Sequence, residues 1–295
     1  MTARPMTELS ASDRRIERSR QSLELLLETF FRPGDWAARL SYQAGLQGRL
    51  RTVEHMIDLG RLAADPSRAP LRLAFASDFH AGATTDPRML AAACDALAAF
   101  EPDVLLLGGD FVSVRASYVN RLAPRLAAIN PPLGKFAVLG NHDLRANHAL
   151  VTAALVGAGV RMLTNTYHAL PQPFEDITLC GLDDATRGDP RPDLSLDAAT
   201  GNGKRIVLMH SPEGLKAMGE RPFDLALCGH THGGQVVLPW GTPLFVPGGH
   251  LNRRYHAGEF ALSNGRRLLV SNGVGCSTIP LRVFAAPEVH LCFIV

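Results

Sequence analysis

The chain lacks several features that would assign it to particular classes of protein. Its 30 Lys and Arg residues nearly balance 28 Asp and Glu residues, so it has no excess of basic charge with which to neutralise nucleic-acid phosphates. No apolar run approaches the roughly eighteen residues of a membrane-spanning helix, and no apolar stretch follows the charged N-terminal residues as in a secretory signal. Repeats, low-complexity segments and lipidation motifs are also missing from the sequence. We therefore expect a soluble, cytoplasmic protein with no nucleic-acid partner.

Cysteine is scarce, and no C-x-x-C pair occurs in the sequence. The five cysteines are far apart, most of them lie inside apolar stretches, and their odd number favours a reducing compartment. With 295 residues and 46% apolar composition, the chain can form one large α/β domain or two small ones with a substantial core.

The first 70 residues have a composition of their own and predict a helical appendage followed by a linker. Apolar residues recur at helical spacing over 13–31 after a cluster of arginines, "RPGD" at 32–35 should end this helix, and a second helical pattern spans 36–62. The first helix has two interpretations: packing on the rest of the chain or on a second subunit, or peripheral contact with the inner face of a membrane. The acidic residues Glu24 and Glu28 favour packing.

From residue 71 to 295 the pattern changes to short apolar runs that alternate with alanine-rich helical stretches, as in βαβ units around a buried sheet. In one such helix, Asp86 is the expected N-cap and Pro87 occupies the first turn. Polar loops or hairpins are expected over 186–204 and 239–258. The predicted strands are "LRLAFAS", "DVLLLGG", "KFAVLG", "DITLCG", "RIVLMH" and "DLALCG".

Side chains able to bind metal follow five of these predicted strands. In an open α/β sheet, ligands bind outside the carboxyl ends of the strands, so we expect these side chains to meet in space. The candidates, in chain order, are Asp78, His80, Asp110, Asn141, His142, Asp143, His210, His230 and His232.

The candidate residues also indicate which metals would bind. Carboxylates, imidazoles and an amide form a mixed nitrogen and oxygen set suited to manganese, iron, zinc or similar ions, without the thiolates of a closed structural zinc site. The set exceeds what one ion needs, whereas two ions that share a bridging carboxylate would use it. The sequence therefore predicts a dinuclear centre suited to phosphoryl displacement.

These residues lie in motifs that resemble those of calcineurin-like metallophosphoesterases. The motifs "DFH" at 78–80, "GGD" at 108–110, "GNHD" at 140–143, the lone His210 and "GHTH" at 229–232 stand in the family's order, each after an expected strand. The resemblance covers residues 71 to about 294 and looks closest to the bacterial branch with "GHTHGGQ". It implies an α/β fold, a four-layer α/β/β/α sandwich, for residues 71–295.

The resemblance also implies how the metal ligands are divided between two ions, with Asp110 and a water or hydroxide as bridges and that hydroxide attacking phosphorus. One ion would take Asp78, His80 and His232, and the other would take Asn141, His210 and His230.

Two residues of "GNHD" receive catalytic roles from the same resemblance. His142 would contact the substrate phosphate and protonate the leaving group as general acid, a task that suits a group titrating near neutral pH. Asp143 would accept a hydrogen bond from His142 and maintain its tautomer. Many relatives carry a carboxylate soon after the bridging aspartate, whereas this chain has Ser113 and Arg115, and Arg115 or Arg145 could meet a second phosphate.

The predicted function is metal-dependent hydrolysis of phosphate esters or of a pyrophosphate bond, with UDP-2,3-diacylglucosamine as one candidate substrate. The alternatives are a non-catalytic scaffold of the same fold, which the complete ligand set disfavours, and a phosphoprotein phosphatase, whose "GDxxDRG" and "GNHE" motifs this chain lacks. Asp183 and Asp184 are expected to anchor a loop. Four histidines outside the motifs are expected to have no role at the metals, although His250 and His256 follow the last motif and could line the pocket; the four are His168, His250, His256 and His290.

Overall fold

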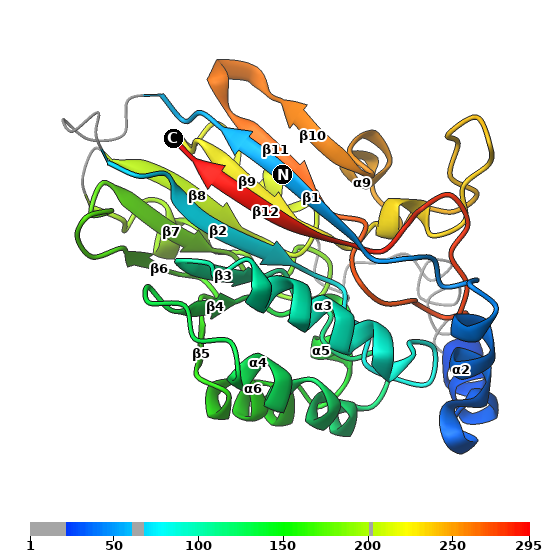
Figure 1. Cartoon of the computed structure of the whole chain (residues 1–295). Coiled ribbons are helices and arrows are strands. Elements are labelled where there is room, and N and C mark those ends of the chain that lie inside the picture. Colours follow the sequence, from blue (N-terminus) through cyan, green and yellow to red (C-terminus); the bar gives the residue numbers. More distant parts are fainter. Residues whose placement is uncertain (1–21, 61–67, 201–202) are drawn as a thin grey trace.

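Each of the six apolar runs that predicted a strand forms one in the computed structural model, which describes residues 22–60, 68–200 and 203–295. The strands belong to two six-stranded sheets that stack face to face (Figure 1). Most neighbouring strands in both sheets are parallel, as expected for βαβ units; in the second sheet both edge strands pair antiparallel, and in the first sheet one internal pair is antiparallel.

The first sheet has the order β1-β12-β2-β3-β4-β5. Its strands are β1 (Arg51–Ile57), β12 (Glu288–Ile294), β2 (Leu71–Ala76), β3 (Val104–Leu107), β4 (Lys135–Ala137) and β5 (Val160–Met162).

The second sheet has the order β10-β11-β9-β8-β7-β6. Its strands are β10 (Gly258–Ala261), β11 (Arg267–Val270), β9 (Leu225–Cys228), β8 (Lys204–Leu208), β7 (Ile177–Gly181) and β6 (Thr166–Ala169).

Helices cover the outer side of both sheets, so the chain has the predicted α/β/β/α sandwich. On the first sheet lie α3 (Pro87–Ala99), α4 (Ala123–Ala127) and α6 (His148–Gly157), with η3 (Ala116–Arg121) and α5 (Asn141–Arg145) beside them. On the second lie α7 (Pro192–Ser195) and α8 (Gly214–Met218), and the long polar loops contain η4 (His232–Gly234), α9 (His250–Arg254) and η5 (Ser263–Gly265).

The alternation of side chains along the strands explains why there are three cores. In β2, Leu73 and Phe75 point into the core between the sheets, whereas Ala74 and Ala76 join the core under α3, α4 and α6. In β9, Leu227 faces the other sheet and Cys228 faces the core under α8. Because both faces are buried, the central strands contain almost only apolar residues.

Two local predictions are confirmed by the same structure. Asp86 caps α3, because its side chain accepts a hydrogen bond from the N–H of Arg88, and Pro87 occupies the first turn. All five cysteines are buried free thiols, as their apolar surroundings indicated.

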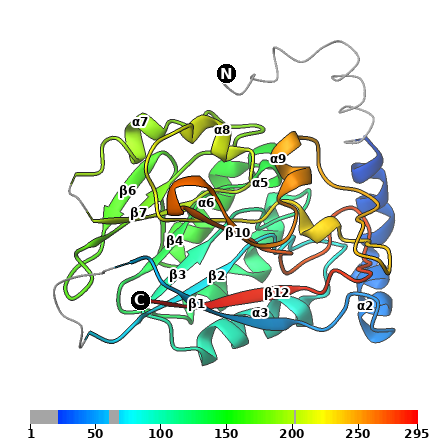
Figure 2. The same cartoon turned by 90° about the horizontal axis from the view of Figure 1, so that it is seen from above.

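The predicted helix over 36–62 is wrong for most of its length. Helix α2 spans only Trp36–Gln43, and residues 51–57 form strand β1, which pairs in parallel with β12 along its whole length (Figure 2). The run alternates exposed and more buried positions, the period of an edge strand, and a partner strand 237 residues downstream leaves no trace in a local pattern. The domain boundary expected at residue 70 stays a prediction. Because β1 pairs with β12, the structure favours a boundary before residue 51.

The rest of the N-terminal segment follows the prediction where it is described. Residues 22–31 are helical and η2 (Pro33–Asp35) follows at "RPGD", while residues 13–21 of the predicted helix and most of the predicted linker lie outside the described residues. In the described ranges, no helix has both the length and the hydropathy needed to cross a bilayer.

The core between the sheets gives the first prediction. Leu106 of β3 is fully buried there, so Leu106→Ala should lower the free energy of unfolding by about 2–5 kcal/mol through lost burial and a cavity. Leu194→Ala on α7, where the side chain is 49% exposed, is the matched control and should change it by less than about 0.5 kcal/mol. Urea unfolding measures both, and equal effects would place Leu106 outside the core.

Candidate metal centre

The loops that follow five strands of the two sheets are joined to one another by backbone hydrogen bonds. The N–H of Asp78 donates to the carbonyl of Gly109 at 2.9 Å, and that of His80 donates to the carbonyl of Asp110 at 3.0 Å. Across the sheets, the N–H of His230 donates to the Asp78 carboxylate at 2.9 Å. The predicted convergence of residues more than 150 positions apart is therefore present in the fold.

Five of the candidate residues have a left-handed backbone, a conformation that costs a residue with a side chain on the order of 1 kcal/mol. Such conformations gather at functional sites, where the surrounding structure holds them in place. Their φ angles are 52° for Asp78, 43° for His80, 53° for Asp110, 72° for His230 and 54° for His232.

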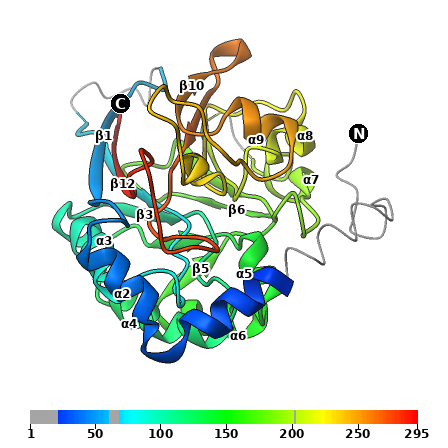
Figure 3. The same ribbon diagram turned by 90° about the vertical axis from the view of Figure 1, so that its right-hand side faces the viewer.

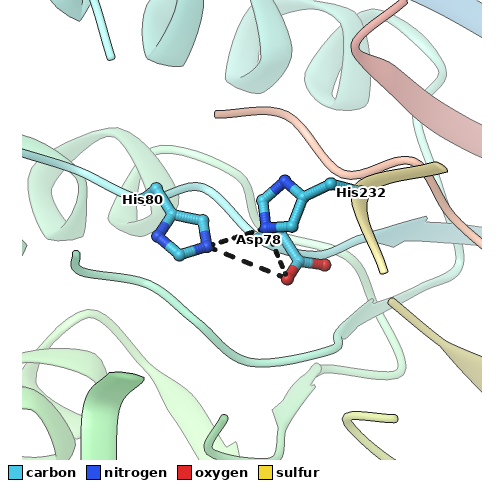
Figure 4. Close-up of side chains that lie close together, drawn as sticks. All are labelled: Asp78, His80 and His232. Atoms are coloured by element: carbon cyan, nitrogen blue, oxygen red, sulfur yellow. Dashed lines mark hydrogen bonds and ion pairs between the residues drawn. The ribbon is translucent and has the colours of Figure 1, made fainter. Parts of the chain in front are cut away.

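A first group of ligand atoms comes from Asp78, His80 and His232 (Figure 4). The two imidazole Nε2 atoms are 3.0 Å apart, and Oδ1 of Asp78 lies 3.5 Å from that of His232 and 4.0 Å from that of His80. Burial lowers the pKa of His80 and His232 well below the ordinary value, so both imidazoles are neutral and can offer a lone pair to a cation.

A second group surrounds His210, whose Nε2 is 3.1 Å from Oδ1 of Asn141, 3.1 Å from Nδ1 of His230 and 3.3 Å from Oδ2 of Asp110. The Nδ1–H of His210 donates to the Gly108 carbonyl at 2.8 Å, so in the neutral ring Nε2 carries a lone pair. That lone pair faces two oxygen acceptors, a repulsive arrangement that either a proton on Nε2 or a cation bound between these atoms relieves.

Asp110 lies close to both groups of ligand atoms. Its Oδ2 lies 3.5 Å from Nε2 of His80 in the first group and 3.3 Å from Nε2 of His210 in the second, while its Oδ1 accepts the backbone N–H of His142 at 2.8 Å. A carboxylate that faces two sets of ligand atoms is the arrangement of a shared ligand between two ions.

The electrostatics of these groups favour bound cations. Burial alone would lower the pKa of His210, but the carboxylates of Asp110 and Asp78 raise it well above the ordinary value, so the pocket attracts positive charge. Burial raises the pKa of Asp78 to about 6, because nothing in the protein alone compensates its charge fully. The residues present therefore fit divalent ions with mixed nitrogen and oxygen ligands.

His142 lies at the start of α5, and one of its ring nitrogens lies within 4.8 Å of ligand atoms of His80 and Asp110. Its Nδ1 is 2.7 Å from the carbonyl oxygen of Ser113 and 2.7 Å from Nη2 of Arg145. Since a guanidinium only donates, Nδ1 interacts with one partner at a time: when protonated it donates to Ser113, and when deprotonated it accepts from Arg145. Either way Nδ1 is engaged, so Nε2 is the nitrogen left for a substrate.

The predicted hydrogen bond between Asp143 and His142 is wrong. The carboxylate of Asp143 accepts the N–H of Gly140 at 3.0 Å and that of Val112 at 3.2 Å, so it ties two of the site loops together. Burial, with the nearby charge of Asp110, raises the pKa of Asp143 to about 8. The Ser113 carbonyl takes the place predicted for this carboxylate, and no sequence pattern reveals a backbone partner.

The residues for which no role at the metals was expected have other contacts in the structure, although Asp184 is buried and its charge acts on His210. Asp184 accepts from the N–H groups of Thr186 and Arg187, and Asp183 accepts from that of Asp189, so both anchor a loop. The remaining histidines are absent from the ligand groups found among the described residues: His168, His250, His256 and His290.

Sequence reasoning missed Arg282, a buried arginine behind the first group. Its guanidinium donates to the carbonyls of Asn272 and Gly275, and Nη2 lies 3.2 Å from Nδ1 of His232. The N–H of Gly275 in turn donates to the Asp78 carbonyl. Arg282 therefore supports the backs of two ligands, yet it lies 50 residues after the last motif and no local signal marks it.

Comparisons with known proteins agree with this geometry. A family model described as calcineurin-like phosphoesterase matches residues 71–234. Phosphodiesterase YaeI of Escherichia coli is 33% identical over 231 residues, 76% of this chain and 82% of that protein. The uncharacterized metallophosphoesterase YkuE of Bacillus subtilis is 31% identical, covering 64% and 66% of the two chains. UDP-2,3-diacylglucosamine pyrophosphatase LpxG of Chlamydia muridarum is 28% identical, covering 74% and 82%.

The contact between Gly140 and Asp110 gives the second prediction. A Cβ at Gly140 would lie 2.2 Å from Oδ1 of Asp110, so Gly140→Ala should displace the carboxylate and reduce bound metal, measured by elemental analysis, by at least about tenfold. Gly157→Ala at the end of α6 is the matched control, because nothing lies within 4 Å of its Cβ, and it should retain metal. Normal metal content in folded Gly140→Ala would contradict the position assigned to Asp110.

Proposed function

The chain belongs to the calcineurin-like phosphoesterase family, and from this membership we propose that it hydrolyses phosphodiester or pyrophosphate bonds with two divalent transition-metal ions. Phosphoester hydrolysis and divalent metal ions are properties of the family. The number of ions, their identity as manganese, iron or zinc, and the bond that is cleaved are our proposal. The position of Asp110 between two groups of ligand atoms carries it.

The division of the ligands follows the two groups in the structure. Asp110 serves both ions, and the small distances within each group support the assignment. One ion is held by Asp78, His80 and His232, and the other by Asn141, His210 and His230.

Such ions, when bound, supply Lewis-acid polarisation of phosphoryl oxygens and a lowered pKa of water. Residues of the chain position the substrate and transfer a proton to the leaving group. We propose His142 as the general acid in its imidazolium form, because its Nδ1–H can then donate to the Ser113 carbonyl while its Nε2–H gives a proton to the leaving group. Asp143 acts at a distance: it holds the loops of Gly140 and Val112, and through them the backbone of His142.

The names of the relatives support a substrate whose reacting phosphorus carries two ester bonds or one ester and one anhydride bond. The Escherichia coli relative is named a phosphodiesterase and the Chlamydia muridarum relative a UDP-2,3-diacylglucosamine pyrophosphatase. We propose the same two bond types for this chain, with UDP-2,3-diacylglucosamine as the lipid-linked candidate.

We also propose that the chain touches the inner face of a membrane through its N-terminal segment, defined as residues 22–43. Several large apolar side chains of this segment face solvent in the structure, and the exposed Arg39 lies beside them on α2. An apolar face with basic residues is the pattern of an interfacial helix. The exposed apolar residues are Leu23, Leu25, Leu26, Phe30, Trp36 and Leu40.

The division of roles gives the third prediction. Asp110→Asn should lose both bound metal and activity, whereas His142→Ala should keep its metal and lose turnover by about 10²–10⁴-fold, as for a missing acid. Metal content by elemental analysis and turnover of a diester, a pyrophosphate diester and a monoester measure the two effects.

Two results would contradict this reading. Equal metal loss in both variants would remove the distinction between ligand and acid, and a fully loaded protein that cleaves none of the three substrates would remove the proposed function. Gly157→Ala is the folded control for both measurements.

The apolar face gives the fourth prediction. Leu26→Asp with Phe30→Asp should reduce co-sedimentation with vesicles that contain anionic lipid by at least about tenfold, since two buried apolar side chains are lost at the interface. Leu194→Asp, on an exposed site of α7, is the control. If wild type and double variant sediment alike, the segment does not bind the membrane.

A further inference from the structure

The helix at residues 22–31 presents its acidic residues to the rest of the protein and its large apolar residues to solvent. Glu24, Leu27, Glu28 and Phe31, spaced along one side, are the less exposed positions, and Glu28 is only 3% exposed. The opposite side is strongly apolar and exposed, as Leu26 at 66% shows. A helix that packs on a protein normally does the reverse, so charge holds this one in place.

Ion pairs join the N-terminal segment to the catalytic part of the chain. Oε2 of Glu24 is 2.5 Å from Nη2 of Arg145, and Oε1 of Glu28 is 3.0 Å from Nε of Arg115 (Figure 3 shows this helix beside α5). A third pair joins Asp35 to Arg121 at 2.8 Å. In every pair the acid belongs to the segment and the arginine to η3, α5 or the loop before η3.

One of these arginines contacts the candidate acid, and a second belongs to the loop that contacts it. Arg145 ends the short helix α5 that begins at Asn141, and its Nη2 is 2.7 Å from Nδ1 of His142. Arg115 follows two residues after Ser113, whose carbonyl oxygen lies 2.7 Å from the same nitrogen. The Arg145 guanidinium therefore lies beside His142 at the edge of the metal centre, and Arg115 belongs to the loop whose Ser113 carbonyl faces the same nitrogen.

A guanidinium is the side chain that best binds phosphate, with two parallel hydrogen bonds, and a carboxylate is its usual competitor. We propose that Arg115 and Arg145 form a subsite for the second phosphate of a pyrophosphate substrate, which Glu24 and Glu28 fill in the free protein. This inference rests on the proposed function and names its substrate class: a compound with two adjacent phosphates, of which one reacts at the metals and the other replaces the glutamates.

The exchange is feasible because it replaces one ion pair by another. Arg145 and Glu24 keep 19% and 17% of their side chains exposed, so the pair is partly solvated, and the released carboxylate regains water. In a pyrophosphate diester the second phosphate has one negative charge and two non-bridging oxygens, as a carboxylate has, so the arginine keeps an acceptor for two parallel hydrogen bonds. Glu24 and Glu28 then no longer hold the helix to the two arginines, and the large apolar side chains of the helix are already exposed to solvent.

The experiment compares substrates that differ by one phosphate. In Glu24→Gln and in Glu28→Gln, the ratio of kcat/KM for a pyrophosphate diester to that for bis(p-nitrophenyl) phosphate should rise roughly tenfold, equivalent to about 1.4 kcal/mol. Arg115→Gln and Arg145→Gln should lower the same ratio. Asp35→Asn, which removes an acid from the same segment without freeing either arginine, is the matched control and should leave the ratio unchanged.

A second measurement needs no turnover. Calorimetric titration of the metal-free protein should show Glu24→Gln binding inorganic pyrophosphate about tenfold more tightly than wild type, with a smaller gain for orthophosphate. An unchanged ratio with unchanged pyrophosphate affinity, or an equal gain in Asp35→Asn, overturns the subsite. A wild type that cleaves neither substrate overturns the proposed function instead, and the titration still decides the subsite.

Discussion

The site depends on the carboxylate of Asp110, which has one oxygen committed to the backbone of His142 and the other turned to imidazoles on both sides. This position needs the left-handed backbone of Asp110 and the missing side chain of Gly140, whose Cβ would overlap the carboxylate. The cost of such a backbone is small beside the burial of apolar surface in two packed sheets. The fold can therefore hold several unfavourable conformations at one edge.

The sandwich explains how ligands from both halves of the chain meet. The first sheet supplies Asp78 and Asp110, the second supplies His210 and the two histidines of "GHTH", and the backbone of His230 donates to Asp78 across the gap. Gly275, held by Arg282, supports Asp78 from behind. Ligand geometry is thus a property of the packing between sheets, and a change in that packing alters the distances between the two groups.

His142, the candidate acid, contacts a backbone carbonyl and an arginine, whereas the sequence predicted a contact with the carboxylate of Asp143. Ser113 contributes its carbonyl, Arg145 competes for the same nitrogen, and Asp143 ties loops together. The arginines in turn connect this side of the centre to Glu24 and Glu28 of the N-terminal segment. The segment that looks accessory in the sequence is therefore in electrostatic contact with the residues nearest the proposed leaving group.

The sequence by itself determined the central strands, the cap of α3 and the candidate ligands, because strand burial and capping are local patterns and each candidate follows closely after a strand. It also determined that the ligands meet, since parallel strands end at a common edge. Only the tertiary structure decided that residues 51–57 are a strand, that Asp143 turns away from His142, and that Glu24 and Glu28 face arginines. These outcomes depend on partners distant in the chain or on backbone atoms, and neither leaves a periodicity or a motif in the residues themselves.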